Sequence, residues 1–163
     1  MQQNRILFHP EVIHLNPIIA DSLAMVLQSA QTKKIEILCL ISGDLEVFAD
    51  SNMLQTILRN LFSNSIKFTG RGGKITISAV KPKDNFIEIS VKDTGIGMNS
   101  AMIDKLFTLG VSSSRKGTEG EASTGLGLII CKDFVEKHGG QLWATSQEGK
   151  GSTFYFTIPG KQF

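Results

Sequence analysis

The sequence predicts an α+β domain, a two-layer α/β sandwich in which a mixed, mainly antiparallel sheet carries helices on one face. Segments with apolar residues at helical spacing are interleaved along the chain with short segments in which apolar and polar residues alternate. These are the periods of an amphipathic helix and of a half-buried strand. Most strand-like segments come in pairs around a short turn, which favours hairpins over a doubly wound parallel sheet.

Length and composition predict one globular domain over residues 1–163. The hydrophobic fraction is 41%, the charged fraction 20% and the net charge +2. So small a charge gives no strong field and argues neither for nor against a nucleic-acid surface. The partners expected below include no nucleic acid. No apolar run reaches the ~18 residues of a membrane span, so we expect a soluble domain without membrane contact. Cys39 and Cys131 lack metal-type spacing and are predicted to be core thiols of a reducing, cytoplasmic compartment.

The first part of the chain predicts a short strand, a helix and two further strands. Residues 5–8, Arg-Ile-Leu-Phe, indicate a short edge strand that Pro10 ends. Asn16 followed by Pro17 is a typical helix start, and the helical stripe continues to Gln31. The two strands are expected at residues 35–41 and 46–49, on either side of a Ser-Gly-Asp turn.

A helix over residues 54–69, capped by Asp50 or Ser51, is predicted to be the central element. Its apolar stripe consists of Leu54, Ile57, Leu58, Leu61, Phe62 and Ser65. Asn60, Asn64 and Lys67 follow the same period and fall within roughly 60° of each other on the flank of that stripe. Burying polar groups unpaired costs on the order of 1–3 kcal/mol each. Two readings follow. Either these polar side chains bind a ligand, or they cap the helix or face solvent.

The second half predicts two hairpins and two helices around a long polar loop. Residues 74–80 and 86–92 form the first hairpin, and a short helix is expected over residues 100–107. Residues 108–124 have almost no apolar anchor, which is too little burial to offset the cost of ordering, so this loop is predicted to be flexible. An apolar helix then runs from about residue 125 to 138, and a last hairpin comprises residues 141–146 and 152–158.

Glycine clusters at the ends of elements indicate a nucleotide site, because exposed backbone N–H groups there bind phosphate. Neither Gly95-Ile96-Gly97 nor Gly125-Leu126-Gly127 completes the dinucleotide fingerprint, and the chain has no Walker-type Gly-Lys-Ser/Thr loop. The common nucleotide-binding folds are therefore excluded.

Four motifs together resemble a known set. They are Asn60…Asn64…Lys67-Phe68-Thr69, Asp93-Thr94-Gly95-Ile96-Gly97-Met98, Thr124-Gly125-Leu126-Gly127-Leu128 and Gly149-Lys150-Gly151-Ser152-Thr153-Phe154. In this order and spacing they resemble the N box and the three glycine boxes of the catalytic, ATP-binding domain of sensor histidine kinases, a branch of the GHKL family. The resemblance covers roughly residues 7–159. It implies a Bergerat-type fold that holds ATP between helices, under a flexible lid at residues 108–124.

The resemblance also implies a role for each motif residue. Asn64 looks like the amide that binds Mg²⁺, and Lys67, beside Phe68, would meet the phosphates. Asp93 resembles the carboxylate that accepts the adenine amino hydrogen, with Gly95 and Gly97 allowing close approach to the base and sugar. Gly125 and Gly127, within the motif that includes Thr124 and Leu126, would face phosphate at a helix start, and Thr153 is an adenine-side candidate. Arg115 and Lys116, in the loop, are either solvated charges or contacts to the γ-phosphate.

Asn60 separates two kinds of chemistry. In related ATPases the matching position is a Glu that activates water, and an amide cannot act as a general base at neutral pH. Asn60, Asn64 and Lys67 are thus predicted to support transfer of the γ-phosphate to another acceptor by positioning and charge neutralisation. The alternatives are a regulatory nucleotide-binding module without transfer, and a GHKL-type ATPase.

The phosphate acceptor is expected outside this chain. In the family the acceptor histidine precedes an acidic residue, whereas His9, His14 and His138 precede Pro, Leu and Gly. We therefore expect no autophosphorylation by the chain alone. The expected partners are a histidine-bearing dimerisation domain of the same parent protein and a downstream response regulator, and the domain alone is expected to be monomeric. One departure concerns the lid, because Phe107-Thr108-Leu109-Gly110 keeps only the first Phe of the common Phe-x-Pro-Phe.

Overall fold

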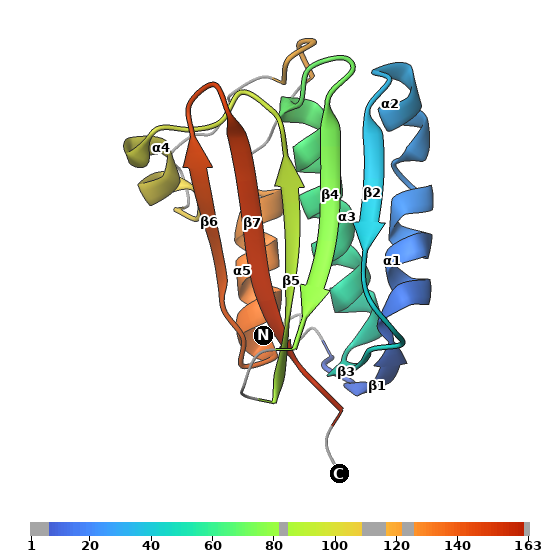
Figure 1. Ribbon diagram of the computed structural model, residues 1–163. Helices are drawn as coiled ribbons and strands as arrows, with labels where there is room; N and C mark the ends of the chain where they lie inside the picture. Colours follow the sequence, from blue (N-terminus) through green and yellow to red (C-terminus); the bar gives the residue numbers. More distant parts are fainter. Residues whose placement is uncertain (1–6, 82–84, 109–116, 122–125, 162–163) are drawn as a thin grey trace, which may run out of the picture.

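The computed structural model describes residues 7–81, 85–108, 117–121 and 126–161 (Figure 1). The helices are α1 (Leu15–Ala24), α2 (Leu27–Thr32), α3 (Ser51–Phe68), α4 (Ser100–Lys105) and α5 (Gly127–Lys137). The strands are β1 (Glu11–His14), β2 (Glu36–Leu40), β3 (Glu46–Ala49), β4 (Lys74–Val80), β5 (Phe86–Asp93), β6 (Leu142–Gln147) and β7 (Gly151–Pro159).

The strands form a five-stranded sheet in the order β2-β4-β5-β7-β6 and a separate pair, β1-β3. Within the larger sheet only β2 and β4 are parallel, and the other neighbours are antiparallel. Helices α1, α3 and α5 cover one face of this sheet, while α4 lies at one end beside β6 (Figure 1). The predicted two-layer sandwich, with a mainly antiparallel sheet and helices on one face, is confirmed.

The core lies between the sheet and the helices. Alternate residues of the central strands point toward the helices and are buried, namely Ile75, Ile77, Ile87, Ile89, Val91, Phe154, Phe156 and Ile158. The apolar stripe of α3 meets them, with Leu54, Ile57, Leu58 and Leu61 fully buried. Because α1 and α5 pack on either side of α3, the polar flank of α3 lies next to α5 and the loops around it.

The N-terminal elements differ from the predicted ones. The first strand is Glu11–His14, whereas Leu7 and Phe8 are not in a strand. Residues 5 and 6 lie outside the described residues. The expected single helix is two helices, broken between Ala24 and Leu27. It begins at Leu15 and not after Asn16, whose amide donates a hydrogen bond to the Gly43 carbonyl oxygen (3.0 Å).

Strands β2 and β3 do not form the expected pair around the Ser-Gly-Asp turn. Strand β2 runs parallel to β4, and β3 pairs with β1. A parallel pair needs a long crossover, and the segment containing β3 and α3 provides it.

The two cysteines differ in solvent exposure. Cys39, on the edge strand β2, is exposed and so is not the predicted core thiol. Cys131, on α5, is buried as predicted. Burial raises the pKa of the Cys131 thiol to about 12, although a hydrogen bond from Asn60 acts in the opposite direction.

None of the helices in the described ranges combines the length and apolar character needed to cross a membrane.

Candidate functional site

The polar flank of α3 is where the structure places the first group of predicted site residues. The helix begins at its N-cap Asp50, whose Oδ1 accepts a hydrogen bond from the Met53 N–H (3.0 Å). Asn60, Asn64 and Lys67 are each half-buried along the flank. Within the described part of the chain, the Asn64 amide and the Lys67 ammonium have no hydrogen-bond or ion-pair partner. These two groups are therefore available to a ligand.

Asn60 faces the start of α5. A Cβ built on Gly127 would lie 3.2 Å from Asn60 Oδ1, which is tighter than most contacts of this kind. Glycine at position 127 thus lets the first turn of α5 approach the amide closely. Leu126 precedes this turn and is half exposed. Thr124 and Gly125 lie outside the described residues, as do Arg115 and Lys116.

Asp93 is the last residue of β5 and points toward the helix side, since it continues the buried positions of that strand. Its side chain is almost fully buried. Its Oδ1 accepts hydrogen bonds from the backbone N–H groups of Gly95 (2.9 Å) and Ser152 (3.1 Å). Two backbone donors on one oxygen fix the orientation of the carboxylate.

The glycines after Asp93 let backbone pass close to backbone. A Cβ on Gly95 would lie 2.1 Å from the Phe68 carbonyl oxygen. Gly97 has a φ of +69°, and a Cβ there would lie 2.0 Å from the Gln147 carbonyl oxygen. Between them, the Ile96 N–H donates to the Phe68 carbonyl oxygen (3.0 Å). The segment is thus held between the end of α3 and the β6–β7 turn, which brings Lys67 and Phe68 close to the Asp93 loop.

Thr153 lies next to Ser152 on β7 with its side chain on the other face of the sheet, and its adenine-side role stays a prediction. It pairs across the sheet with Lys92 and Thr145, on the face away from the helices. Ser152, which was not singled out from the sequence, is the β7 residue that contacts Asp93, through its N–H. Strand alternation could have found it, because Ser152 shares a face with the apolar Phe154 and Thr153 does not.

A serine pair supports the Asp93 loop from the hairpin side. The Ser152 hydroxyl is 2.7 Å from the Ser146 hydroxyl, and Ser146 Oγ accepts a hydrogen bond from the Met98 N–H (2.8 Å). The start of β7 and the end of β6 are thereby tied to the segment that follows β5.

Of the predicted lid, the structure describes residue 108 and the turn at residues 117–121. Lys33, a buried residue just after α2, donates to Thr118 Oγ1 (2.6 Å) and lies 3.0 Å from the Glu121 carboxylate. This polar contact was not predicted from the sequence, which indicated only that apolar anchors are scarce in the loop. The anchors it has are polar and not apolar. The flexibility of residues 108–124 stays a prediction.

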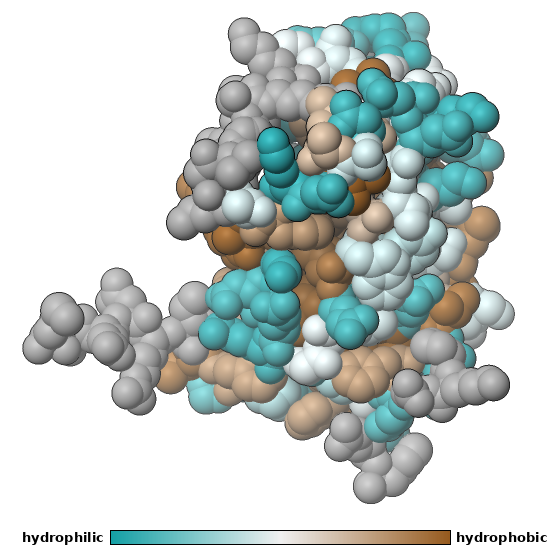
Figure 2. All heavy atoms as spheres, turned by 90° about the vertical axis from the view of Figure 1, so that its left-hand side faces the viewer, coloured by the Kyte–Doolittle hydropathy of each residue, from teal (hydrophilic) through white to brown (hydrophobic). Residues whose placement is uncertain are grey.

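Apolar side chains are exposed at the edge of the molecule formed by α4, α5 and the Asp93 loop. They are Ile96, Met102, Leu126 and Ile130. Figure 2 views the molecule from the side on which β6 lies in Figure 1, and shows brown apolar surface between teal hydrophilic residues. Contiguous exposed apolar surface beside a site is typical of contact with another protein or domain.

Comparison with known proteins places these features in a family context. The model of the family "Histidine kinase-, DNA gyrase B-, and HSP90-like ATPase" matches residues 49–162. The adaptive-response sensory kinase SasA of Prochlorococcus marinus subsp. pastoris is 34% identical over 154 residues, which are 94% of this chain and 41% of that protein. The sensor histidine kinase WalK of Bacillus subtilis is 40% identical over 120 residues, or 73% of this chain and 20% of that protein.

Among solved structures, the nucleotide-free catalytic domain of the histidine kinase ThkA matches with a TM-score of 0.80 and 29% identity, covering 93% of this chain and 95% of that one. The sequence resemblance to histidine kinase catalytic domains is confirmed by these matches. The chain spans less than half the length of the SasA and WalK kinases it matches.

Proposed function

Because this chain belongs to the family of histidine kinase-, DNA gyrase B- and HSP90-like ATPases, we propose that it is the Mg·ATP-binding catalytic domain of a two-component sensor histidine kinase. It would transfer the γ-phosphate of ATP to a histidine on a separate dimerisation domain of the same parent protein. A response regulator would then receive the phosphate. The kinase names of the relatives support this reading.

The observation that carries the proposal is the arrangement of charge at the end of α3. Asn64 and Lys67 present an amide and a cation without partners among the described residues. The loop after Asp93 is held against the same helix end through Phe68. A ligand with an amino-bearing base near Asp93 and phosphates near Lys67 matches this distribution, since a carboxylate accepts N–H and an ammonium binds phosphate.

Magnesium fits the residues present. Asn64 offers an amide oxygen of the kind Mg²⁺ accepts, and Mg²⁺ is usually held by one or two protein oxygens together with waters and substrate phosphates. No group of three or more His, Cys, Asp or Glu side chains suited to a metal occurs in the described ranges. Asn64 would therefore hold the ion jointly with the nucleotide, and the ion would neutralise phosphate charge.

Asn60 favours phosphate transfer over hydrolysis. Its amide is 3.2 Å from the position of a Cβ on Gly127, at the start of α5, and an amide does not remove a proton from water at neutral pH. Gly127, which belongs to the family's phosphate-side motif, lies next to it. The ATPase alternative lacks a general base at this position, and the regulatory-module alternative has no specific observation in its favour.

The phosphate acceptor is proposed to be a histidine outside this chain. The His138 ring is buried and hydrogen-bonded at both nitrogens, to the Asp50 N–H and the Phe134 carbonyl oxygen. A buried, fully bonded imidazole is a poor phosphate acceptor. We expect the histidine to come from the dimerisation domain, with the exposed apolar edge at α4 and α5 as the contact surface. We also propose a cytoplasmic location and a monomeric state for the isolated domain.

The test is reconstitution of the two halves. The chain is mixed with the separately produced dimerisation domain of its parent protein and γ-labelled Mg·ATP. Acid-labile label on that domain is the expected result, and it should disappear when the acceptor histidine is replaced. Release of free phosphate without label transfer would indicate an ATPase, and ATP binding with neither would indicate a regulatory module. Incubation of the chain alone should leave it unlabelled.

A further inference from the structure

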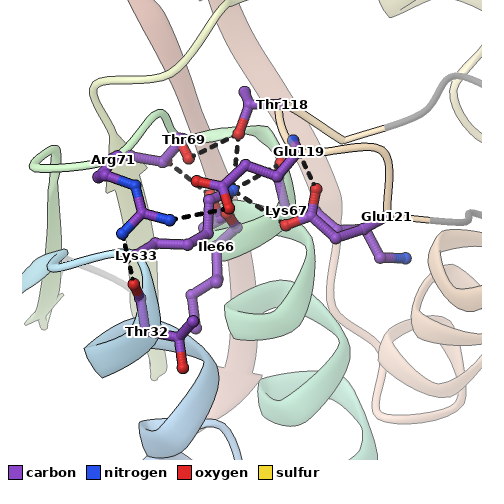
Figure 3. A network of polar contacts seen from close by, with 10 residues as sticks. Thr32, Lys33, Ile66, Lys67, Thr69, Arg71, Thr118, Glu119 and Glu121 are labelled. Atoms are coloured by element: carbon purple, nitrogen blue, oxygen red, sulfur yellow. Dashed lines mark hydrogen bonds and ion pairs between the residues drawn. The ribbon is translucent and has the colours of Figure 1, made fainter.

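One buried cation joins three segments that are far apart in the sequence (Figure 3). Lys33 directly follows α2, and its side chain is 4% exposed. Its ammonium donates hydrogen bonds to the carbonyl oxygens of Ile66 (2.8 Å) and Lys67 (3.2 Å) at the end of α3. It also donates to Thr118 Oγ1 (2.6 Å) and Glu121 Oε2 (3.0 Å) in the turn 117–121. Lys33 thus ties α2, the end of α3 and this turn together.

The chemistry of a helix end explains why a lysine is buried here. The last carbonyl groups of a helix have no partner within the helix and carry partial negative charge, so a cation is favoured beside them. Burying an ammonium is costly unless it is paired and hydrogen-bonded. Glu121 supplies the opposite charge, and two carbonyl oxygens and a hydroxyl supply the remaining acceptors.

Glu121 is itself fixed within the turn. Its Oε1 accepts a hydrogen bond from the Glu119 N–H (2.9 Å). Burial raises the pKa of this carboxyl, but hydrogen bonds from backbone N–H groups and from Lys33 outweigh burial and hold the pKa below its ordinary value. Glu121 is therefore ionised at neutral pH.

The same turn holds the backbone of Lys67 directly. The Thr118 N–H donates to the Lys67 carbonyl oxygen (2.8 Å), and the Thr118 hydroxyl donates to the Thr69 carbonyl oxygen (3.1 Å). The Lys67 backbone therefore has bonds from both Lys33 and Thr118. Its ammonium, in contrast, has no partner in the described part of the chain.

We propose that Lys33 is a positioning residue for Lys67. With Thr118 and Glu121, it fixes the backbone of the last turn of α3 so that the Lys67 ammonium is presented to the phosphates in one orientation. This inference rests on the proposed function, in which Lys67 binds phosphate. It adds that residues outside the four family motifs set the strength of phosphate binding.

The turn contains a matched control for this idea. Glu119 forms an ion pair with Arg71 (3.1 Å), and both side chains are substantially exposed. Glu119→Gln and Glu121→Gln remove the same charge from the same turn. Only Glu121→Gln removes the counter-ion of the buried Lys33. An exposed ion pair contributes little, whereas a hydrogen bond to a buried charged group contributes more.

The experiment has two arms and uses the chain carrying Glu121→Gln, Glu119→Gln or Lys33→Met. In the first arm, hydrogen exchange of the Thr118 amide is measured without nucleotide. In the second, calorimetry gives the affinities for Mg·ATP and for adenosine. Glu121→Gln should speed exchange at Thr118 and weaken Mg·ATP binding about tenfold, which is the size expected for a charged hydrogen bond, while adenosine binding stays unchanged.

Lys33→Met should have the same effects in larger measure, and Glu119→Gln should change neither quantity. Unchanged exchange in Glu121→Gln would overturn the anchor. Faster exchange with an unchanged affinity for Mg·ATP, or equal losses for Mg·ATP and adenosine, would overturn the positioning role. A parent chain that binds neither compound would contradict the proposed function instead, and the exchange arm, run without nucleotide, separates that failure from a failure of the anchor. Glu121→Gln keeps the test decisive if Lys33→Met does not fold.

Discussion

Substitution of Asp93 can test its proposed contact with adenine without disturbing the fold. Asp93→Asn retains an oxygen for the N–H groups of Gly95 and Ser152 but replaces a charged acceptor with an NH₂ group. A hydrogen bond to a charged group contributes roughly 1.5–3 kcal/mol, so affinity for ATP should fall by about ten- to a hundredfold. Calorimetry measures this, and thermal unfolding should show little loss of stability. Glu88→Gln, on the same strand but facing the other side of the sheet, should bind ATP normally, and parental affinity in Asp93→Asn would refute the adenine assignment.

Asn64 carries a test for the metal. Asn64→Ala should abolish most of the dependence of ATP binding on Mg²⁺, because the amide oxygen is the proposed protein ligand. The measurement is ATP affinity as a function of Mg²⁺ concentration. Asn52→Ala, at an exposed position near the other end of α3, is the control. A Mg²⁺ titration that is the same for Asn64→Ala and the parent would argue against this role.

Site residues could be predicted from the sequence where they belong to a motif. They could not be predicted where only the folding of the chain brings them together. Asn64, Lys67 and Asp93 come from motifs, and the structure places them around the end of α3. In the last glycine motif, Thr153 stays a predicted adenine-side residue, while Ser152, one position earlier on the buried face of β7, donates its N–H to Asp93. Lys33 and Glu121 are 88 positions apart and belong to no motif, so nothing local in the sequence signals their contact.

The N-caps of α3 and α4 should differ in how much they contribute to the stability of the whole domain. Asp50 caps a helix of 18 residues that is central to the core, and Asn99 caps an exposed helix of 6 residues in the same manner. Asp50→Ala should lower the free energy of unfolding by about 1–2 kcal/mol. Asn99→Ala should cost much less, since α4 has no buried residue. Chemical denaturation measures both, and equal losses would contradict the central role of α3.

The contribution of Asp50 should also depend on pH. Burial raises the pKa of its carboxyl, but hydrogen bonds from backbone N–H groups, including that of His9, outweigh burial and hold the pKa below its ordinary value. A carboxyl with a lowered pKa stabilises the folded state above its ordinary pKa, and this stabilisation is lost as the pH falls through the folded-state pKa. The difference in unfolding free energy between the parent and Asp50→Asn should therefore be constant near neutral pH and shrink below about pH 4. A difference that persists at lower pH would contradict this assignment.

Helices and strands with a regular hydrophobic pattern were predicted with nearly the right bounds. Which strands pair with each other was predicted less well. The bounds of α3, β3 and β4 agree closely with those expected, because an unbroken apolar stripe or alternation defines them. The break between α1 and α2 has no Gly or Pro to mark it. The parallel pairing of β2 with β4 is set by packing across the crossover, which neighbouring residues do not encode.

The molecule as a whole separates the proposed nucleotide site from the open face of its sheet. The single Trp143 stacks on Tyr155 on that open face, with ring centroids 5.2 Å apart. Since the sheet lies between this pair and α3, Mg·ATP should leave the fluorescence of Trp143 nearly unchanged. A tryptophan introduced as Phe68→Trp, in a Trp143→Phe background, should respond to Mg·ATP. Fluorescence titration tests both, and a large response from Trp143 would place the site on the other face.

The position of β7 in the sheet has a consequence for how the chain matures. Although β7 comes after every other strand in the sequence, it lies between β5 and β6. During synthesis, β5 therefore emerges long before the neighbour that completes it, and its edge stays unpaired in the meantime. The Ser152 N–H that holds Asp93 arrives with this strand. Nascent chains that end before β7 should thus be prone to aggregate, and competence to bind ATP should appear only once β7 has emerged and inserted between β5 and β6.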